Sequence, residues 1–344
     1  MIKPSSLRAC SLATLLVAAT CAVPNSASAD VPYDTIEVPI NALKFPGRSK
    51  YLVADLDGDG SYEFVFKDMP HNYDPTSFPV SSDFKDIIRI RAIDLQGNLL
   101  WTHELSQGVV PGLWWSPVLV YDLDQDGKTE VYAKDADYYG GWPTKNQLAT
   151  FDSPVDDKIV KLDPLTGEVV ARNDWPERGK APFEFLTNNR NALFVVYVDS
   201  GSGIKPHIAA LRGKYKRMFV TLYDSDLNIV AKWNDEMEAP THTETQGGQS
   251  FQVSDYFDSG GSVSLGADVD GDGQDELMLG SSCLKYDKNR PAGQRLYGLW
   301  AVGGNIDCNY VGDIIWDRPG LEVWINNERY GRRSGVYDAR TGEE

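Results

Sequence analysis

An internal repeat that begins with closely spaced aspartates constrains the fold of this chain more than any other feature. The pattern Asp-x-Asp-x-Asp-Gly, followed by a glutamate and an apolar stretch, covers residues 55–63, 122–130 and 268–276. Weaker copies begin at Asp199 and Asp313. Such self-similarity is typical of chains built from supersecondary units that each bury an apolar face against the next unit.

A second pattern follows the aspartate loops and predicts β-hairpins. Residues 90–101, 160–170, 220–230 and 336–343 read as an alternating strand, an Asp- and Gly-containing turn, and another strand. Each full repeat therefore encodes about four short strands. Four-stranded sheets repeated radially form a β-propeller. We expect an all-β chain with about four and a half blades, and stacked sandwiches are the alternative.

The two ends of the chain raise separate questions. Residues 1–29 combine Lys3 and Arg8, a short apolar core and small residues before Asp30, which predicts a secretory signal peptide and a propeller domain over residues 30–344. An uncleaved anchor is the alternative. The last residues lie at a turn that elsewhere precedes an outer strand. Either residues 35–39 supply that strand, or the sequence is truncated, which we favour.

Charge limits the class of partner. The chain has 344 residues and a formal net charge of -17, which disfavours nucleic acid because phosphate binding needs clustered Lys and Arg. We expect a secreted monomer, extracellular or periplasmic, with no membrane contact after signal cleavage.

The aspartate loops themselves predict calcium sites. Carboxylates at alternate positions of a tight loop converge on one hard cation, and glycines permit the turn. The alternative is an Asp- and Gly-rich turn held by its own backbone hydrogen bonds. The predicted ligands are Asp55, Asp57, Asp59 and Glu63, then Asp122, Asp124, Asp126 and Glu130, then Asp268, Asp270, Asp272 and Glu276.

Two cysteines remain after the signal segment, Cys283 and Cys308. In an oxidising compartment this pair is a disulfide candidate. Two free thiols are the alternative.

Four stretches carry a resemblance to a known family. They are residues 134–137, 189–190, 212–217 (Arg-Gly-x-Tyr-x-Arg) and 317–323 (Asp-Arg-Pro-Gly-Leu-Glu-Val). Together with the aspartate loops, they make the chain similar to the rhamnogalacturonan lyases, polysaccharide lyase family eleven, with ulvan lyases as cousins. The resemblance implies a propeller that cleaves an acidic, uronate-containing polysaccharide by β-elimination.

The resemblance also suggests site residues. In β-elimination a base removes the C5 proton while a cation neutralises the neighbouring carboxylate. We expect Arg212 to be that cation and Tyr215 the proton carrier, with Lys134, Arg190 and Arg217 as substrate contacts. The alternative is that Arg212 and Arg217 form salt bridges with nearby loop carboxylates.

Loop aromatics and histidines complete the candidates. Tyr138, Tyr139 and Trp142 could stack on sugar rings or pack between blades. His71 and His242 lie in polar segments and could contact substrate or be solvated.

Two classes of function remain open. One is a calcium-binding polysaccharide lyase; the other is a non-catalytic propeller that binds carbohydrate or a protein partner. Where the family carries histidines before aspartate loops, this sequence has Trp114, Ser262, Asn305 and Tyr310, which favours the second class. The Arg-Gly-x-Tyr-x-Arg stretch favours the first.

Overall fold

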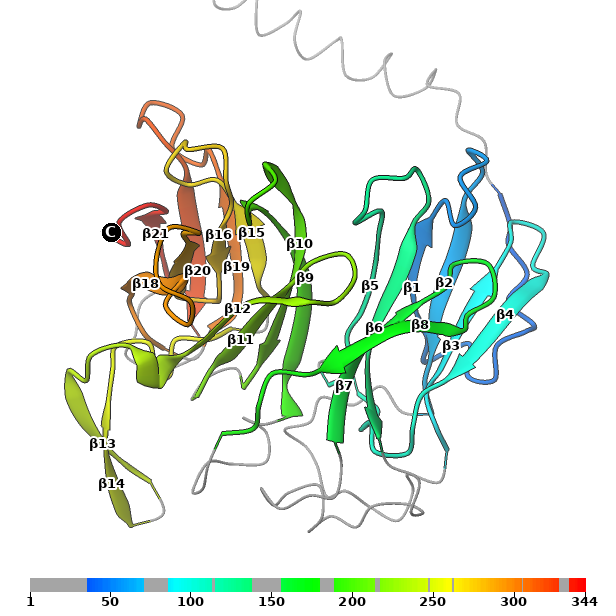
Figure 1. Cartoon of the computed structure of the whole chain (residues 1–344), viewed down its shortest axis with the longest axis horizontal. Coiled ribbons are helices and arrows are strands. Elements are labelled where there is room, and N and C mark those ends of the chain that lie inside the picture. The colour runs from blue at the N-terminus through cyan, green and yellow to red at the C-terminus, as the bar shows by residue number, and fades with distance from the viewer. Residues whose placement is uncertain are drawn as a thin grey trace, which may run out of the picture. The chain divides into compact units, whose positions relative to one another are not determined.

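The repeats all fall in the second of two units, Met1–Val38 and Pro39–Glu344 (Figure 1). The structure, a computed structural model, describes residues 36–70, 86–112, 115–137, 156–179, 189–213, 217–246, 248–261, 263–304, 306–327 and 334–344. The predicted signal peptide, residues 1–29, lies outside the described residues. Across the described ranges, no helix has the length and apolar character needed to cross a membrane.

Each full repeat forms a four-stranded antiparallel sheet whose strands follow one another in chain order. The first sheet contains β1 (Lys50–Ala54), β2 (Glu63–Asp68), β3 (Arg89–Ile93) and β4 (Leu99–Glu104). The second contains β5 (Val118–Tyr121), β6 (Glu130–Asp137), β7 (Asp156–Leu162) and β8 (Val169–Asp174). The third contains β9 (Asn191–Asp199), β10 (Ile204–Arg212), β11 (Phe219–Tyr223) and β12 (Ile229–Asn234). The fourth contains β15 (Leu265–Ala267), β16 (Glu276–Met278), β17 (Ser282–Tyr286) and β18 (Leu296–Ala301).

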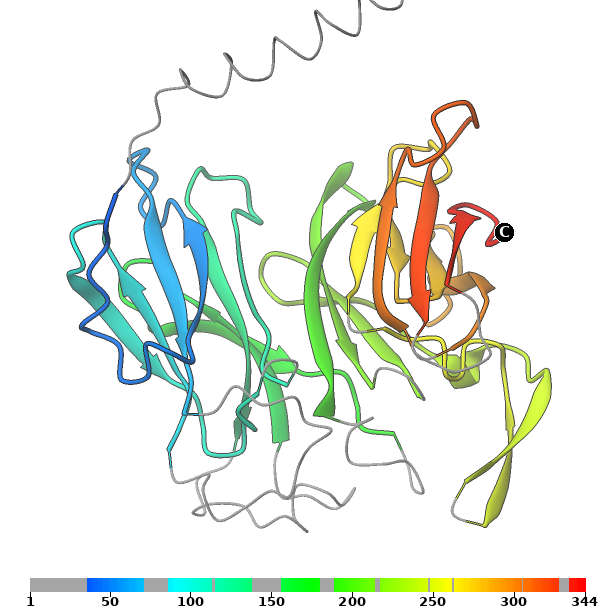
Figure 2. The ribbon, with the colours of Figure 1, turned by 180° about the vertical axis from the view of Figure 1, so that it is seen from behind.

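The fifth sheet has three strands among the described residues: β19 (Ile306–Gly312), β20 (Glu322–Asn327) and β21 (Gly335–Asp338). A two-stranded ribbon, which the repeats do not predict, lies between the third and fourth sheets in the chain. It consists of β13 (His242–Gln246) and β14 (Gln249–Val253) and follows the short 3-10 helix η2 (Asp235–Met237). Figures 1 and 2 both show this ribbon standing apart from the sheets.

The sheets meet face to face, with their first strands side by side. β1 contacts β5, β5 contacts β9, and β9 contacts β15. This arrangement of successive sheets is that of propeller blades, so the predicted all-β propeller with four-stranded blades is confirmed, including the partial fifth blade.

The alternation of side chains along the strands builds the cores between blades. On β2, Phe64 and Phe66 point to one face and pack with Leu43, whereas Val65 points to the other and belongs to the core cluster that also contains Val131 of the second blade. Successive residues of a strand face opposite sides of the sheet. A blade whose strands carry apolar side chains on both faces can therefore pack against a neighbour on each face. Comparable clusters separate the later blades.

In two places, a tryptophan of one blade packs against a glycine in the hairpin turn of the next blade. Trp101 on β4 donates its indole N–H to the carbonyl of Pro164, 2.7 Å away in the hairpin turn of the second blade. Gly167 in that turn has a φ of +72°, and a Cβ there would lie 2.5 Å from the Trp101 ring. Trp300 and Gly342 repeat the contact between the fourth and fifth blades. Glycine is therefore required at this turn for close approach as well as for φ.

The segment before β1 belongs to the first blade. Pro39 lies against Gly97 in the first hairpin turn, where a Cβ would be 2.5 Å from the Pro39 carbonyl oxygen. Leu43 packs against Phe66 and Ile93. Pro39 therefore lies with the first blade, and the completion of the last blade by residues 35–39 stays a prediction.

Candidate functional site

The first acidic loop connects β1 to β2 and is closed by its own carboxylates. The Asp55 carboxylate accepts backbone hydrogen bonds from Gly58 at 2.8 Å and Gly60 at 3.0 Å. Glu63, the first residue of β2, accepts a hydrogen bond from the Leu56 backbone N–H at 2.9 Å. These bonds fix the positions of the acidic side chains, because the backbone N–H groups direct their positive dipoles at the carboxylates.

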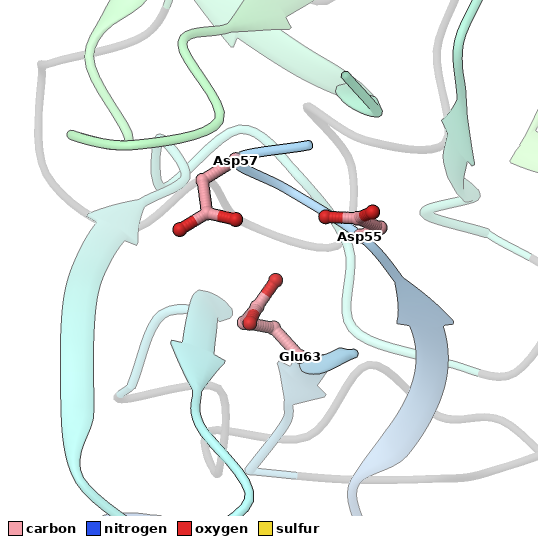
Figure 3. A group of neighbouring side chains, drawn as sticks. All are labelled: Asp55, Asp57 and Glu63. Carbon is pink, nitrogen blue, oxygen red and sulfur yellow. The ribbon is translucent and has the colours of Figure 1, made fainter. Parts of the chain in front are cut away.

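Three carboxylates converge in each loop. Oxygens of Asp55, Asp57 and Glu63 lie within 4.8 Å of one another and surround a common space (Figure 3). The other two loops form equivalent clusters, Asp122, Asp124 and Glu130 in one and Asp268, Asp270 and Glu276 in the other. Oxygen ligands at such distances suit a hard divalent cation, so each of the three clusters could bind a metal ion.

The third aspartate of each loop is not part of its cluster. Asp59, Asp126 and Asp272 instead accept hydrogen bonds from the backbone N–H two residues further on, at 2.7, 2.9 and 2.8 Å. The structure thus brings together three of the four ligands expected per loop. The remaining aspartates stabilise the exit of the turn, which is the Asx-turn role.

The glutamates of the clusters are the least solvated members. Glu63, Glu130 and Glu276 are all buried, and burial raises the pKa of each carboxyl group above its ordinary value. The neighbouring Asp57 and Asp55 raise the pKa of Glu63 further. A buried carboxylate beside other carboxylates favours any bound positive charge, so the donor set fits a metal ion.

Lysines reach two of the clusters. The Lys161 ammonium lies 2.8 Å from Glu130, and the Lys285 ammonium lies 2.8 Å from Glu276 and also contacts Asp270 and Asp272. Neither lysine belongs to the aspartate pattern.

A different charged centre gathers around Asp157 on β7. Its carboxylate contacts the Lys134 ammonium at 2.5 Å and the guanidinium groups of Arg178 and Arg212, each at 2.7 Å. Arg212 also donates to the Pro176 carbonyl at 2.6 Å. Lys134 lies on β6 beyond Glu130, and Arg212 ends β10, so this cation cluster lies at the end of the sheets away from the acidic loops.

Burial dominates the electrostatics of the cation cluster. Lys134 is 3% exposed and Arg212 is 1% exposed. Burial lowers the pKa of Lys134 to about 8 and that of Arg212 to about 10, with Asp157 opposing both shifts. Burial would raise the pKa of Asp157, but the three cations outweigh it and hold that pKa well below its usual range. Asp157 is therefore charged and holds the cations together.

The other predicted contacts lie at separate places. Arg190 is buried, and its backbone carbonyl accepts from Gly213 at 2.9 Å, directly after Arg212. Arg217 forms an ion pair with the fully buried Asp235 at 2.7 Å, in the connection between β10 and β11. His242 is exposed on the ribbon. Arg212 and Arg217 thus pair with carboxylates, as the alternative expects, but the partners lie on a strand and a 3-10 helix and not in loops.

Several predicted residues cannot be placed. Tyr215, Tyr138, Tyr139, Trp142 and His71 lie outside the described residues, and their roles stay predictions. Cys283 is buried and Cys308 half-buried, and the structure has both as free thiols without a bridge.

Sequence reasoning missed Asp157 and Arg178. Asp157 lies in an Asp-Asp-Lys run with no repeat signature, and 55 residues separate it from Arg212. A buried cation needs a carboxylate or hydrogen-bond partner, so the burial of Arg212 would imply that a partner exists. The rule does not identify which of the chain's acidic residues is that partner.

The chain is similar to known proteins over most of its length. Residues 43–145 and 159–344 match the model of "Rhamnogalacturonan lyase family 11, C-terminal domain". The rhamnogalacturonan exolyase YesX of Bacillus subtilis (strain 168) is 30% identical over 311 residues, which cover 85% of this chain and 46% of the relative. The rhamnogalacturonan endolyase YesW of the same organism is 29% identical over 309 residues, with the same two shares. The chain therefore spans about half the length of these relatives.

Solved structures give the same result. The crystal structure of the exotype rhamnogalacturonan lyase YesX superposes with a TM-score of 0.67 at 26% identity, covering 86% of this chain and 48% of that one. The crystal structure of YesW superposes with a TM-score of 0.66 at 25% identity, covering 86% and 49%. Since the family model also matches most of the blades, the resemblance seen in the sequence is confirmed, and the chain belongs to rhamnogalacturonan lyase family 11.

Proposed function

We propose that this protein is a secreted, calcium-binding polysaccharide lyase that cleaves an acidic, uronate-containing polysaccharide such as rhamnogalacturonan by β-elimination. Two relatives that cover most of this chain are named as rhamnogalacturonan lyases. The observation that carries the proposal is the cation cluster of Lys134, Arg178 and Arg212 around one carboxylate.

The cluster supplies the charge that this reaction needs. β-Elimination becomes easier when positive groups neutralise the uronate carboxylate and make the C5 proton more acidic. In a chain of net charge -17, a local group of cations is also what would let a polyanion approach. Arg212, as part of this group of cations, would help to neutralise the uronate carboxylate. Tyr215, three residues later, would carry the C5 proton.

The remaining predicted contacts belong to the same proposal. Arg190 adjoins Arg212 through the backbone bond to Gly213. Tyr138, Tyr139 and Trp142 follow β6 in the chain, directly after Lys134 and Asp137, and would offer ring faces to sugars. His71 and His242 would be further polar contacts.

Calcium would have a structural role at the acidic loops. Each cluster connects the first two strands of a blade, so a bound ion would fix the blade's inner hairpin. Asp55, Asp57 and Glu63 would hold the ion in the first loop, with equivalent residues in the others. In this proposal the calcium ions stabilise the fold and take no part in the elimination.

The test follows unsaturated uronate by its ultraviolet absorbance. The full chain is incubated with calcium and with rhamnogalacturonan, ulvan or another uronate polymer. We expect an absorbance increase that falls at least about 100-fold in Tyr215→Phe, since a positioned proton carrier contributes about that much or more. Tyr51→Phe, which alters an exposed tyrosine on β1, is the matched control and should keep full activity. A folded protein that gives no increase on any polymer would contradict the lyase proposal.

A second candidate function is non-catalytic carbohydrate binding on the same scaffold. The burial of Arg212, together with its pairing to Asp157, favours it, because that guanidinium has little surface to offer a substrate. Here the folded protein would produce no unsaturated uronate but would still be retarded in affinity electrophoresis through an acidic polysaccharide.

A further inference from the structure

The three acidic clusters share one geometry but differ in the positive charge around them. Each has two aspartates and a buried glutamate whose oxygens lie within 4.8 Å. The ion pairs of the described residues place no lysine or arginine on the first cluster, one lysine beside the second, and one lysine within the third.

Among the described residues, no lysine or arginine forms an ion pair with the carboxylates of the first cluster. Glu63 is 8% exposed, and the hydrogen bond to its carboxylate comes from the Leu56 backbone. A cleft of about 430 Å³ opens beside the cluster, and its charged lining residues are Asp57, Asp59, Glu63 and Asp94. Carboxylates held this close, one of them mostly buried, repel one another strongly unless a cation lies between them. The cleft gives such a cation access.

The third cluster already contains a cation of its own. The Lys285 ammonium lies 2.8 Å from Asp272 and from Glu276 and also contacts Asp270. An ammonium group has three N–H donors, and here it contacts two carboxylates of the cluster, Asp270 and Glu276, and the adjacent Asp272. The lysine thus supplies a positive charge at the cluster, and its side chain is only 15% exposed.

The hairpin turns locate Lys285 within the repeat. Lys285 lies two residues before Asp287, whose backbone N–H closes the turn of the fourth blade. Asp94 and Asp163 begin the equivalent turns of the first and second blades. The counterparts of Lys285 are therefore Ala92 and Lys161, so this position carries a positive charge in the second and fourth blades and none in the first.

The second cluster lies between these extremes. Lys161 lies at the position equivalent to Lys285 and approaches its cluster at 2.8 Å from Glu130 and 3.6 Å from Asp124. It therefore makes one close contact with carboxylates, whereas Lys285 makes three.

We propose that Lys285 is a built-in counter-cation that makes the third acidic loop independent of divalent metal, so that the first loop is the principal divalent-cation site of the chain. This rests on the metal binding in the proposed function. A divalent ion entering the third loop must displace the ammonium and break its charge-assisted hydrogen bonds. An ion entering the first loop displaces no side-chain cation among the described residues.

Calorimetric titration of the full chain with calcium chloride, after removal of bound metal with a chelator, tests the proposal. We expect one tight class of site in the unmodified protein and its loss in Asp57→Asn. Lys285→Met should add one further site or raise the affinity of a weak one at least tenfold. Lys285→Arg, which keeps the charge, should behave like the unmodified protein. Lys288→Met is the matched control, because Lys288 pairs with Asp199 outside the cluster.

Folding is followed in parallel by circular dichroism. A Lys285→Met chain that unfolds in chelator and refolds with calcium also supports the proposal, since metal then replaces the ammonium. Unchanged stoichiometry and affinity in folded Lys285→Met overturns it, as does a tight site that survives Asp57→Asn. If Lys285→Met does not fold at any calcium concentration, the Asp57→Asn titration decides. Absence of calcium binding in every variant overturns metal binding itself.

Discussion

The acidic loops and the cation cluster hold their charges in opposite ways. Each loop draws its carboxylates from a run of nine residues, Asp55 to Glu63 in the first case, and leaves two of the three clustered side chains partly exposed. The cation cluster forms once, from Lys134, Asp157, Arg178 and Arg212, all largely withdrawn from solvent. The loops can bind cations from the solvent, whereas the cluster combines three cations with one carboxylate inside the fold and keeps a net positive charge.

Removal of Asp157 should give the largest effect. Asp157→Asn leaves Lys134, Arg178 and Arg212 buried without this carboxylate, and breaking a buried ion pair costs about 3–5 kcal/mol. Denaturant unfolding should show that loss of stability. Asp174→Asn is the control, because Asp174 pairs with Lys158 on the surface and should cost less than about 1 kcal/mol. Equal losses in the two variants would remove the distinction between buried and exposed charges.

Removal of calcium should give the second-largest loss of stability, and this loss should arise from the acidic loops alone. An ion present at about 100 times its Kd stabilises the folded state by about 2.7 kcal/mol. Chelator should therefore lower the thermal midpoint by roughly 5 °C, and calcium should restore it. Asp57→Asn should reduce this calcium-dependent shift, whereas Lys134→Met should leave it unchanged. A midpoint that does not respond to chelator would show that the loops are stable without metal.

The buried lysines should give a pH dependence of known sign. Burial lowers the pKa of Lys134 to about 8 and that of Lys67 to about 7. An unfolded lysine keeps its proton up to about pH 10.4, so between these values the unfolded chain binds more protons. The free energy of unfolding should rise with pH in this window, by up to about 1.4 kcal/mol per pH unit for each lysine.

Unfolding of Lys134→Met measured between about pH 8 and pH 10 checks this slope. The variant should lose the share that Lys134 contributes, and Lys67→Met should lose a comparable share. Lys158→Met, whose ion pairs raise the pKa of Lys158, should keep the slope. Identical slopes in all four proteins would show that the buried lysines titrate as in the unfolded chain.

Substitution of the third aspartate of a loop should have the smallest effect, because this residue lies outside the cluster of converging carboxylates. Asp59 accepts a hydrogen bond from Ser61 and is not among the converging carboxylates. Asp59→Asn should change calcium affinity by less than about threefold, which is below about 0.7 kcal/mol. Asp57→Asn should change it by at least about tenfold. Calorimetric titration of both variants distinguishes the three-ligand cluster from the four-ligand set that the sequence pattern suggests.

Features formed by one continuous segment could be predicted from the sequence, whereas contacts between distant segments could not. The repeats predict the blades because each blade is one continuous segment, and the aspartate pattern predicts the clusters because Asp55 and Glu63 share one loop. The partners of Lys134 and Arg212 could not be predicted, because the strand pairing that brings Asp157 to them is fixed only when the second and third blades fold. Lys285 was missed for a related reason, since it lies across a hairpin from its carboxylates.

The contact of Trp101 with Gly167 divides one structural unit between two neighbouring repeats. The indole belongs to the outer strand of one blade, and the glycine belongs to the hairpin turn of the next. The first blade moved alone would leave Trp101 without its turn, and the second blade moved alone would leave its turn without the indole. The module that can be duplicated or exchanged is therefore offset from the blade. It runs from an outer strand to the following hairpin turn, and chimeric propellers cut at those boundaries would keep each contact intact.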